Sequence, residues 1–365
     1  MEQIALGRHQ RILRNEKDTF MNHRRNLSPQ QMFIDIARRH VPKYRYQGQP
    51  FNAWKDAALP EVMATLGEMP RSCDLNPELV AEWEHDGLRK QKWYIDVSEF
   101  ISATFQINFP PKMELGRKYP AILCCHGHDK AGKEELMGNV PDKEIQAANG
   151  LLFGHELAKQ GFITFAIDWI GKGDRNDNQK PNHKQDIGGR DWCNLYYLHA
   201  TMLGMTSLGI NIAHGRAAMD FVSTFSEVDA NKIGVMGWSG GGTMSLWMTL
   251  SDPRIKATEI ISYSDLWECF GIRDLNYCGW QVAPGLYKLV DLPDLQGLLA
   301  PRPLLIDIGM TDQCFRIESA MPCFKQVEKI YTAAGARKQL QLNLDSGGHG
   351  AWNKNLTHEF FKRYL

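Results

Sequence analysis

Residues 232–248 read KIGVMGWSGGGTMSLWM and contain the pattern G-x-S-x-G, with Ser239 at its centre. The pattern directly follows an apolar run of strand character and directly precedes a run of helix character. A serine on so sharp a turn takes a strained backbone conformation, so the residues two before and two after it, Gly237 and Gly241, must lack bulk. A helix that begins near Gly240 directs its free N–H groups toward the serine. This context predicts a nucleophilic serine rather than a glycine-rich turn without chemistry.

A serine hydroxyl needs a base to remove its proton and a third group to orient that base. Around a serine on a strand-to-helix turn, the acid and then the histidine follow later in the chain. Residues 303–312 read PLLIDIGMTD, an apolar strand that ends in a turn at Asp312, which is the predicted acid; Asp307, inside the run, is the alternative. His349 lies further on, in the glycine-rich loop SGGHG, and is the predicted general base.

A second donor to a developing oxyanion should come from the loop after an early strand. Residues 121–129 read AILCCHGHD and end such a strand. We assign the backbone N–H groups of His128 and Gly240 to an oxyanion hole. The side chains of His126 and His128 raise the alternative of a metal site, but no third ligand stands at a convincing spacing. We therefore expect no metal and no cofactor, and a turn-stabilising role for His126.

Two parts of the chain differ in character. Residues 1–90 carry basic, helix-favouring pieces broken by prolines, which predict a helical N-terminal extension. Over residues 91–365 strand-like and helix-like runs alternate, which predicts an α/β catalytic domain with a mostly parallel central sheet and helices on both faces. The first two runs, 93–97 and 100–109, predict a hairpin. Further strands are expected at 121–125, 163–168, 233–236, 257–261, 304–308 and 339–344, and helices at 31–39, 152–160, 196–225, 242–250 and 320–334.

The composition limits the kinds of partner. Lys plus Arg and Asp plus Glu both number 42, so the formal net charge is zero, and no general attraction to nucleic acid or to an anionic membrane is expected. The start of the chain is polar and no apolar stretch is long enough for a membrane span, which favours a cytoplasmic protein. The eight cysteines show neither zinc-site nor disulfide-framework spacing, so reduced thiols are expected. The oligomeric state stays open, and a homo-oligomer is compatible with the sequence.

These motifs together resemble the α/β-hydrolase superfamily, and specifically its dienelactone-hydrolase-like and acetyl-xylan-esterase-like bacterial esterases that bear an N-terminal extension. The resemblance implies an α/β-hydrolase fold and a serine esterase that forms an acyl-enzyme through a Ser-His-Asp triad. The implied substrate is an acylated carbohydrate or another small ester. Dienelactone hydrolases proper carry a cysteine at the elbow, so Ser239 points away from lactone hydrolysis. The resemblance covers about residues 90–365 and rests on His126-Gly127-His128, Asp168 with Gly171-Lys172-Gly173-Asp174, the Gly237–Gly241 elbow, Asp312 and Gly348-His349. The likeness to esterases with an N-terminal extension rests on Cys278–Gly285, Asp291–Asp294 and Ala300–Pro303.

Two other functions remain open at this point. A carbon–carbon bond hydrolase uses a similar triad, and product analysis would separate it from an esterase because it releases no alcohol. A non-catalytic binding protein could keep the same fold, since fold alone does not establish activity. Such a protein would fail to react with serine-directed reagents at Ser239.

Overall fold

The computed structural model describes residues 25–140, 151–177 and 191–365. The chain divides into two compact units, residues 1–40 and 41–365, and each is described by itself. The described residues of the first unit form helix α2, Pro29–Arg39, close to the helical piece predicted there. Ser28 caps this helix because its hydroxyl accepts a hydrogen bond from the N–H of Gln31 at 3.2 Å.

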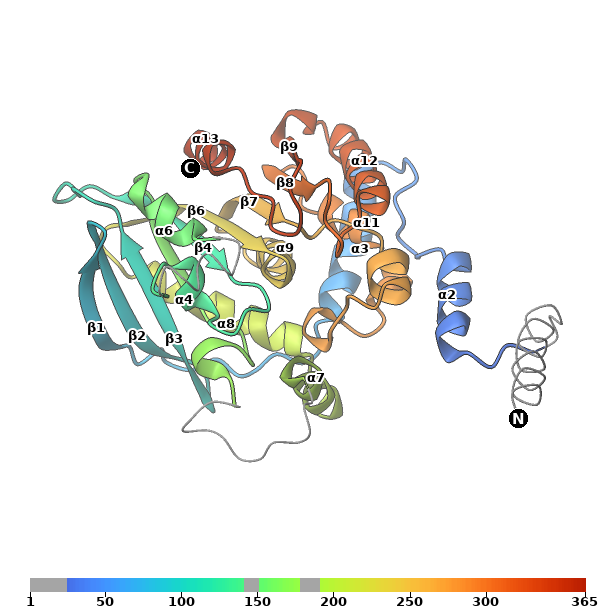
Figure 1. Ribbon diagram of the computed structural model, residues 1–365, viewed down its shortest axis with the longest axis horizontal. Coiled ribbons are helices and arrows are strands. Elements are labelled where there is room, and N and C mark those ends of the chain that lie inside the picture. The colour runs from blue at the N-terminus through green and yellow to red at the C-terminus, as the bar shows by residue number, and fades with distance from the viewer. Residues whose placement is uncertain (1–24, 141–150, 178–190) are drawn as a thin grey trace, which may run out of the picture. The chain divides into compact units, whose positions relative to one another are not determined.

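The second unit is built around a nine-stranded sheet with the strand order β1-β2-β3-β5-β4-β6-β7-β8-β9 (Figure 1). Strands β1, β2, β3 and β5 pair antiparallel in turn, and the remaining neighbours pair parallel. The sheet is therefore mostly parallel, as predicted, with antiparallel strands at one edge. The strand bounds are β1 Glu78–His85, β2 Leu88–Ser98, β3 Ile101–Phe109, β4 Tyr119–Cys125, β5 Ile163–Ile167, β6 Val228–Trp238, β7 Ile255–Ile261, β8 Leu304–Gly309 and β9 Leu340–Asp345.

Apolar side chains alternate between the two faces of the sheet, because successive residues of a strand point in opposite directions. In β4, Ile122 and Cys124 belong to one buried cluster, while Leu123 and Cys125 belong to the other. Helices α6 and α13 pack on the first face, and α8, α9 and α12 pack on the second (Figure 1). This is the predicted α/β arrangement.

The helices of the second unit, in chain order, are α3 Phe51–Ala64, α4 Lys133–Leu136, α6 Phe153–Lys159, α7 Trp192–Met202, α8 Ser207–Val222, α9 Gly240–Ser251, α10 Leu286–Leu289, α11 Leu292–Gly297, α12 Ile317–Ala333 and α13 Lys354–Tyr364. Shorter helical turns are the 3₁₀ segments η1 Gly173–Arg175, η3 Gly279–Gln281 and η4 Arg337–Gln339, and the π-helical turn η2 Trp267–Arg273.

The predicted hairpin is present as β2 and β3, in which Trp93 lies opposite Phe105. The expected boundary at residue 90 does not coincide with the division of the structure, since residue 90 lies inside β2 and β1 already belongs to the sheet. The physical reason is that β1 is an edge strand with mostly exposed side chains. Such a strand needs no apolar alternation, and its sequence ELVAEWEH carries no clear strand pattern.

The helix predicted over residues 196–225 is divided into α7 and α8. Gly204 lies between them and adopts a φ of +76°, the left-handed conformation that ends many helices. Thr206 then caps α8, because its hydroxyl accepts a hydrogen bond from the N–H of Gly209 at 2.8 Å. Both helices bury apolar residues, so the apolar pattern alone did not separate them.

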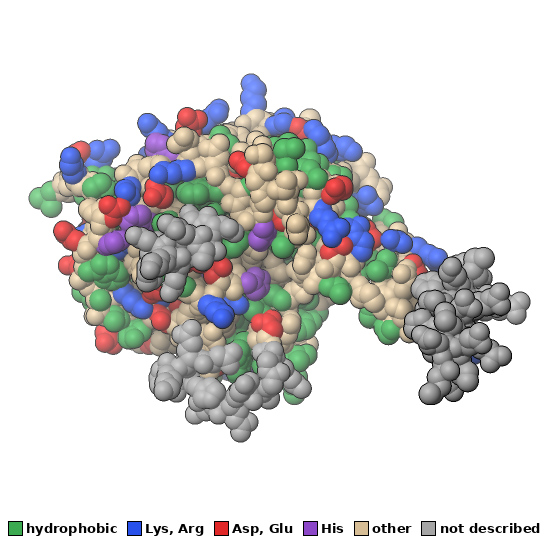
Figure 2. All heavy atoms as spheres, viewed as in Figure 1, with side chains coloured by type: hydrophobic (Ala, Val, Ile, Leu, Met, Phe, Trp, Pro, Cys, Tyr) green, Lys and Arg blue, Asp and Glu red, His purple; other side chains and the backbone are tan. Residues whose placement is uncertain are grey.

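The molecular surface carries charges of both signs. The face seen in Figure 2 shows Lys, Arg, Asp and Glu side chains intermingled over its described part, in keeping with the formal net charge of zero. Among the described residues, no helix combines the length and the apolar character that crossing a membrane would require.

Candidate active site

Ser239 lies at the junction of β6 and α9, on a turn that forces its backbone into a strained conformation. Its φ is 55° and its ψ is −118°, a region that costs a residue with a side chain about 1–3 kcal/mol. A Cβ atom on Gly237 would lie 2.3 Å from the carbonyl oxygen of Gly241, and one on Gly241 would lie 2.0 Å from that of Cys125. Only glycine fits either position, which is the local geometry of a nucleophile elbow.

His349 and Asp312 come together from the loops after β9 and β8. Nδ1 of His349 lies 2.9 Å from Oδ2 of Asp312. The other oxygen of this buried carboxylate accepts hydrogen bonds from the N–H groups of Cys314 and Phe315, at 2.7 and 3.0 Å. These two bonds fix the carboxylate, and the carboxylate in turn orients the imidazole.

Asp307, the alternative acid, makes different contacts. It is buried in β8, accepts a hydrogen bond from Nδ2 of Asn343 at 2.7 Å and pairs with Glu259. Burial raises the pKa of Asp307 to about 7. Burial, and to a smaller extent the nearby charge of Asp307, raises the pKa of Glu259 well above its ordinary value. The two groups form a buried carboxyl pair, and the structure brings Asp312 rather than Asp307 to His349.

Two aromatic rings flank the imidazole of His349. The ring of Trp238 lies 5.2 Å away between centroids, and the ring of Phe315 stacks at 5.7 Å with an angle of 14° between the planes. Trp238 directly precedes Ser239, so this contact holds the imidazole beside the elbow. Because Nδ1 lies against Asp312, Nε2 is the ring nitrogen that faces away from this carboxylate.

The two predicted oxyanion segments lie against each other. Gly240 is the first residue of α9, where backbone N–H groups have no partner within the helix. A Cβ atom on Gly240 would lie 2.8 Å from the imidazole of His128, so that ring touches the start of α9. The carbonyl oxygen of His128 accepts a hydrogen bond from Nζ of Lys172 at 3.0 Å, and its ring meets that of Trp280 edge-on at 4.9 Å. Contacts on several sides thus hold His128 at the elbow.

His126 has a structural role at the base of the same loop. Its Nε2 accepts a hydrogen bond from the N–H of Trp169 at 3.0 Å, and its Nδ1 lies 2.8 Å from the carbonyl oxygen of Gly127. Since Nε2 is an acceptor, the proton lies on Nδ1 and the imidazole is neutral. Burial, which lowers the pKa of His126 to about 4, favours the same neutral form. The predicted turn-stabilising role of His126 is confirmed, because these bonds tie the loop after β4 to the loop after β5.

A buried ion network supports these two loops and was not predicted. Nζ of Lys133 lies 2.7 Å from Oδ2 of Asp168 and 2.9 Å from Oδ2 of Asp174. Burial alone would lower the pKa of Lys133, but the charges of Asp168, Glu134 and Asp174 outweigh it and raise that pKa. Asp168 and Asp174 stood out as motif residues in the sequence. Their partner, Lys133, is the first residue of α4, and no local sequence pattern marks it.

Two groups of potential metal ligands occur among the described residues, each with its ligand atoms within 4.8 Å of one another. The sequence suggested His126 and His128 as a metal pair without a third ligand at a convincing spacing, and neither group found in the structure contains that pair. The two thiols near His128, those of Cys193 and Cys278, come from segments that are distant in the sequence, and spacing rules do not detect such groups. The groups are His128 with Cys193 and Cys278, and Asp312 with Cys314 and His349.

The comparison with known sequences decides the family. The Abhydrolase family matches residues 18–341, which is most of the chain. The chain belongs to the Abhydrolase family. This membership confirms the resemblance to α/β-hydrolases that the motifs indicated.

This Abhydrolase family member has relatives in several bacteria. It is 24% identical over 294 residues to the Bacillus subtilis (strain 168) protein named "Putative hydrolase YtaP", covering 79% of this chain and 92% of that protein. Its structure resembles that of a Bacteroides fragilis protein described as a "putative acetyl xylan esterase", with a TM-score of 0.70, 20% identity and coverage of 88% of this chain and 83% of the other. A glucuronoyl esterase from Solibacter usitatus gives a TM-score of 0.61 at 15% identity, covering 85% and 93%. At these identities the two structures establish the fold, which is the predicted α/β-hydrolase fold.

Proposed function

We propose that this Abhydrolase family protein is a serine carboxylic ester hydrolase with Ser239, His349 and Asp312 as its catalytic triad. The observation that carries the proposal is the 2.9 Å contact between His349 and Asp312 beside the strained elbow. The three residues follow parallel strands β6, β9 and β8 at their carboxyl ends, where the active sites of open α/β sheets form. The esterase names of the structurally similar proteins support the same reaction class.

In the proposed reaction, Nε2 of His349 takes the proton of Ser239 Oγ as this oxygen attacks the ester carbonyl carbon. Asp312 keeps the imidazole oriented and stabilises its protonated form. The oxyanion accepts hydrogen bonds from the backbone N–H groups of Gly240 and His128. His349 then gives its proton to the departing alcohol, and the acyl group stays on Ser239. A water molecule, deprotonated by His349, attacks this acyl-enzyme and releases the carboxylic acid.

An acylated carbohydrate or another small ester is the proposed substrate class. The names of both structural neighbours refer to esters of sugars. In an acetyl xylan ester the sugar supplies the alcohol, whereas in a glucuronoyl ester it supplies the acyl group. Trp280 touches His128 from the segment after β7, so this segment adjoins the proposed reaction centre. Parallel assays with acetylated xylo-oligosaccharides and with alkyl esters of glucuronic acid separate the two groups of substrate.

Labelling with a small fluorophosphonate, followed by intact-mass analysis, tests the nucleophile. We expect one adduct on the wild type, mapped to Ser239 and absent from Ser239→Ala. Ser251→Ala is the matched control, because Ser251 ends the same helix and its hydroxyl donates to the carbonyl oxygen of Trp247. An adduct that persists in Ser239→Ala contradicts the assignment. A folded wild type that forms no adduct favours a binding protein instead.

Product analysis separates ester hydrolysis from carbon–carbon bond hydrolysis, which a similar triad can perform. An esterase releases one acid and one alcohol per turnover, and both can be measured by chromatography. Cleavage of a diketone without any turnover of esters would replace the proposed reaction with the alternative one.

A further inference from the structure

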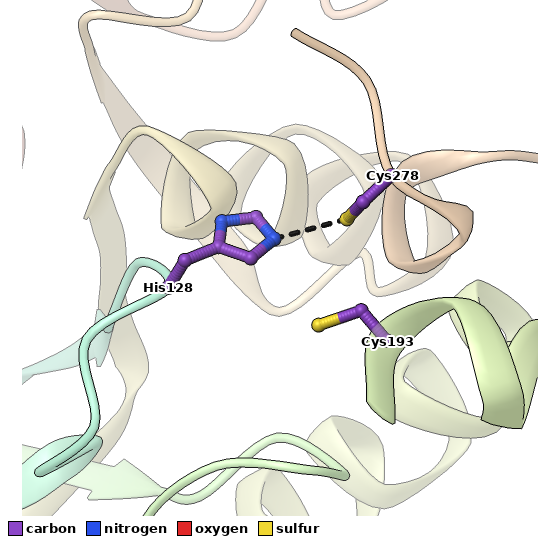
Figure 3. A group of neighbouring side chains, drawn as sticks. All are labelled: His128, Cys193 and Cys278. Atoms are coloured by element: carbon purple, nitrogen blue, oxygen red, sulfur yellow. Dashed lines mark hydrogen bonds between the residues drawn. The ribbon is translucent and has the colours of Figure 1, made fainter. Parts of the chain in front are cut away.

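We propose that His128, Cys193 and Cys278 bind a soft divalent cation of the zinc type beside the candidate active site. Nε2 of His128 lies 3.0 Å from Sγ of Cys278, and the three ligand atoms all lie within 4.8 Å of one another. Figure 3 shows the three side chains facing one another from three separate segments: the loop after β4, helix α7 and the chain before η3.

The fold holds the two cysteines in place. Cys193 lies in the first turn of α7 and is buried. Cys278 directly precedes Gly279, whose N–H donates a hydrogen bond to Oδ1 of Asn194 at 2.8 Å. A Cβ atom on Gly279 would lie 2.2 Å from Cβ of Tyr197, so this segment passes α7 as closely as a glycine allows. The two thiols are therefore positioned by the backbone on both sides, before any cation binds.

The donor set determines which cations fit. Two thiolates and one imidazole favour soft or borderline cations such as zinc over magnesium and calcium, which prefer oxygen ligands. Zinc binds sulfur at about 2.3 Å and imidazole nitrogen at about 2.0 Å, so its ligand atoms lie roughly 3.5–4 Å apart. The spacing found here requires only small side-chain movements to reach that geometry. Two thiolates balance the charge of the cation, and three protein ligands leave a fourth position for water or another group.

The exposure of the three side chains allows a cation to enter. Cys193 is only 1% exposed, whereas His128 and Cys278 are partly exposed. A cation can therefore approach from the side of His128 and Cys278 and reach the buried thiol last. On the side of the buried Cys193 the site is closed to water.

The second group of ligands, Asp312, Cys314 and His349, offers a competing location. It contains one thiol instead of two, and two of its members belong to the proposed triad. A cation there would occupy the imidazole that the reaction needs. The number of thiolates bound to the cation therefore separates the two locations.

Cation binding at His128 would also affect the loop that carries this residue. The ring of His128 touches the start of α9, so a cation bound to Nε2 would fix the His128 loop at the proposed oxyanion hole. This consequence rests on the proposed esterase function, whereas the binding of the cation does not.

Titration of the reduced, full-length protein with Co²⁺ tests the site, because Co²⁺ bound to thiolates gives charge-transfer absorption. We expect one Co²⁺ per chain, absorption of the strength that two thiolates give, and displacement by Zn²⁺. Cys193→Ser and Cys278→Ser should each weaken binding at least about tenfold, because even residues that only support a ligand usually contribute that much. Circular dichroism checks that each variant is folded. If serine is not tolerated at the buried Cys193, the partly exposed Cys278 still provides the test.

Cys73→Ser and Cys314→Ser are the matched controls. Cys73 is an exposed thiol outside both groups, and Cys314 belongs only to the second, so both variants should bind Co²⁺ as the wild type does. Unchanged binding in Cys278→Ser, lost binding in Cys314→Ser, or no uptake by the folded, reduced wild type would overturn the proposal. Fluorophosphonate labelling of Ser239 on the same samples reports the proposed esterase function separately.

Discussion

Nδ1 of His349 lies 2.9 Å from Oδ2 of Asp312, and two backbone N–H groups hold the other oxygen of that carboxylate. Asp312→Asn should therefore leave the fold intact while the imidazole loses its preferred tautomer and orientation. We expect kcat for ester hydrolysis to fall by about 10⁴-fold, as it does when the orienting carboxylate of a comparable triad is replaced by an amide. Steady-state kinetics on a substrate that the wild type hydrolyses measures the effect.

Asp307→Asn is the control for this prediction, because it makes the same chemical change in the buried pair with Glu259. Its kcat should stay close to that of the wild type. A large loss in Asp307→Asn together with a small one in Asp312→Asn would reverse the choice of acid.

The close approach of Gly241 to β4 predicts a second result. In Gly241→Ala the new Cβ atom would lie 2.0 Å from the carbonyl oxygen of Cys125, and the nearest atoms all belong to the backbone of Cys125 and His126, which limits relief. We expect a loss of stability of about 1–3 kcal/mol or more, measured as a lower urea midpoint, together with loss of ester hydrolysis. Gly271→Ala is the control, since its Cβ atom would make ordinary contacts at 3.4 Å or more with Tyr277. Equal midpoints for the two variants would contradict the steric argument.

The buried Lys133 gives a third prediction. Lys133→Met removes the cation between Asp168 and Asp174 and leaves the fully buried carboxylate of Asp168 without its ion-pair partner. Breaking such a buried pair costs about 3–5 kcal/mol, so the free energy of unfolding should fall by that order. In Lys325→Met only an exposed pair with Glu328 is lost, and the change should stay below about 1 kcal/mol. Urea unfolding of both variants tests the difference. A free energy of unfolding that falls no further in Lys133→Met than in Lys325→Met would show that the buried network is not important for stability.

The carboxyl pair in the sheet predicts how stability changes with pH. Burial raises the pKa of Asp307 to about 7 from an ordinary value of 3.8. A group whose pKa is raised on folding stabilises the folded state at pH below its unfolded pKa, and that contribution is lost as the pH rises through the folded value. The wild type should therefore lose on the order of 1–3 kcal/mol more stability between pH 4 and pH 8 than Asp307→Asn does. Urea midpoints measured across this range give the comparison, and parallel curves would refute the raised pKa.

The features that were predictable from sequence are those whose causes are local. The glycines around Ser239 are required by one tight turn, and Asp312 and His349 follow strands whose apolar runs are plain to see. The strands of the parallel sheet are buried on both faces, so they stand out as continuous apolar segments. Family membership and fold agree with these predictions.

The features that were missed depend on contacts between distant segments or on the absence of burial. The edge strand β1 has mostly exposed side chains, and the break at Gly204 interrupts no apolar pattern. Lys133 forms its ion pairs with two carboxylates from the segment after β5. Cys193 and Cys278 meet His128 only because α7 and the segment before η3 pack together. No spacing rule within one sequence shows such convergence.

The antiparallel pairing of β3 with β5 has a consequence for how the chain behaves when it is shortened. Strand β5 would be an open edge without β3, and its unpaired backbone groups would be available to strands of other molecules. On this side of the sheet the edge strand is β1. Its exposed Glu78, Glu82 and Glu84 carry charges that oppose the pairing of a strand from another molecule. We therefore expect residues 78–109 to limit aggregation, and a fragment that starts after residue 109 to self-associate more readily than the whole chain.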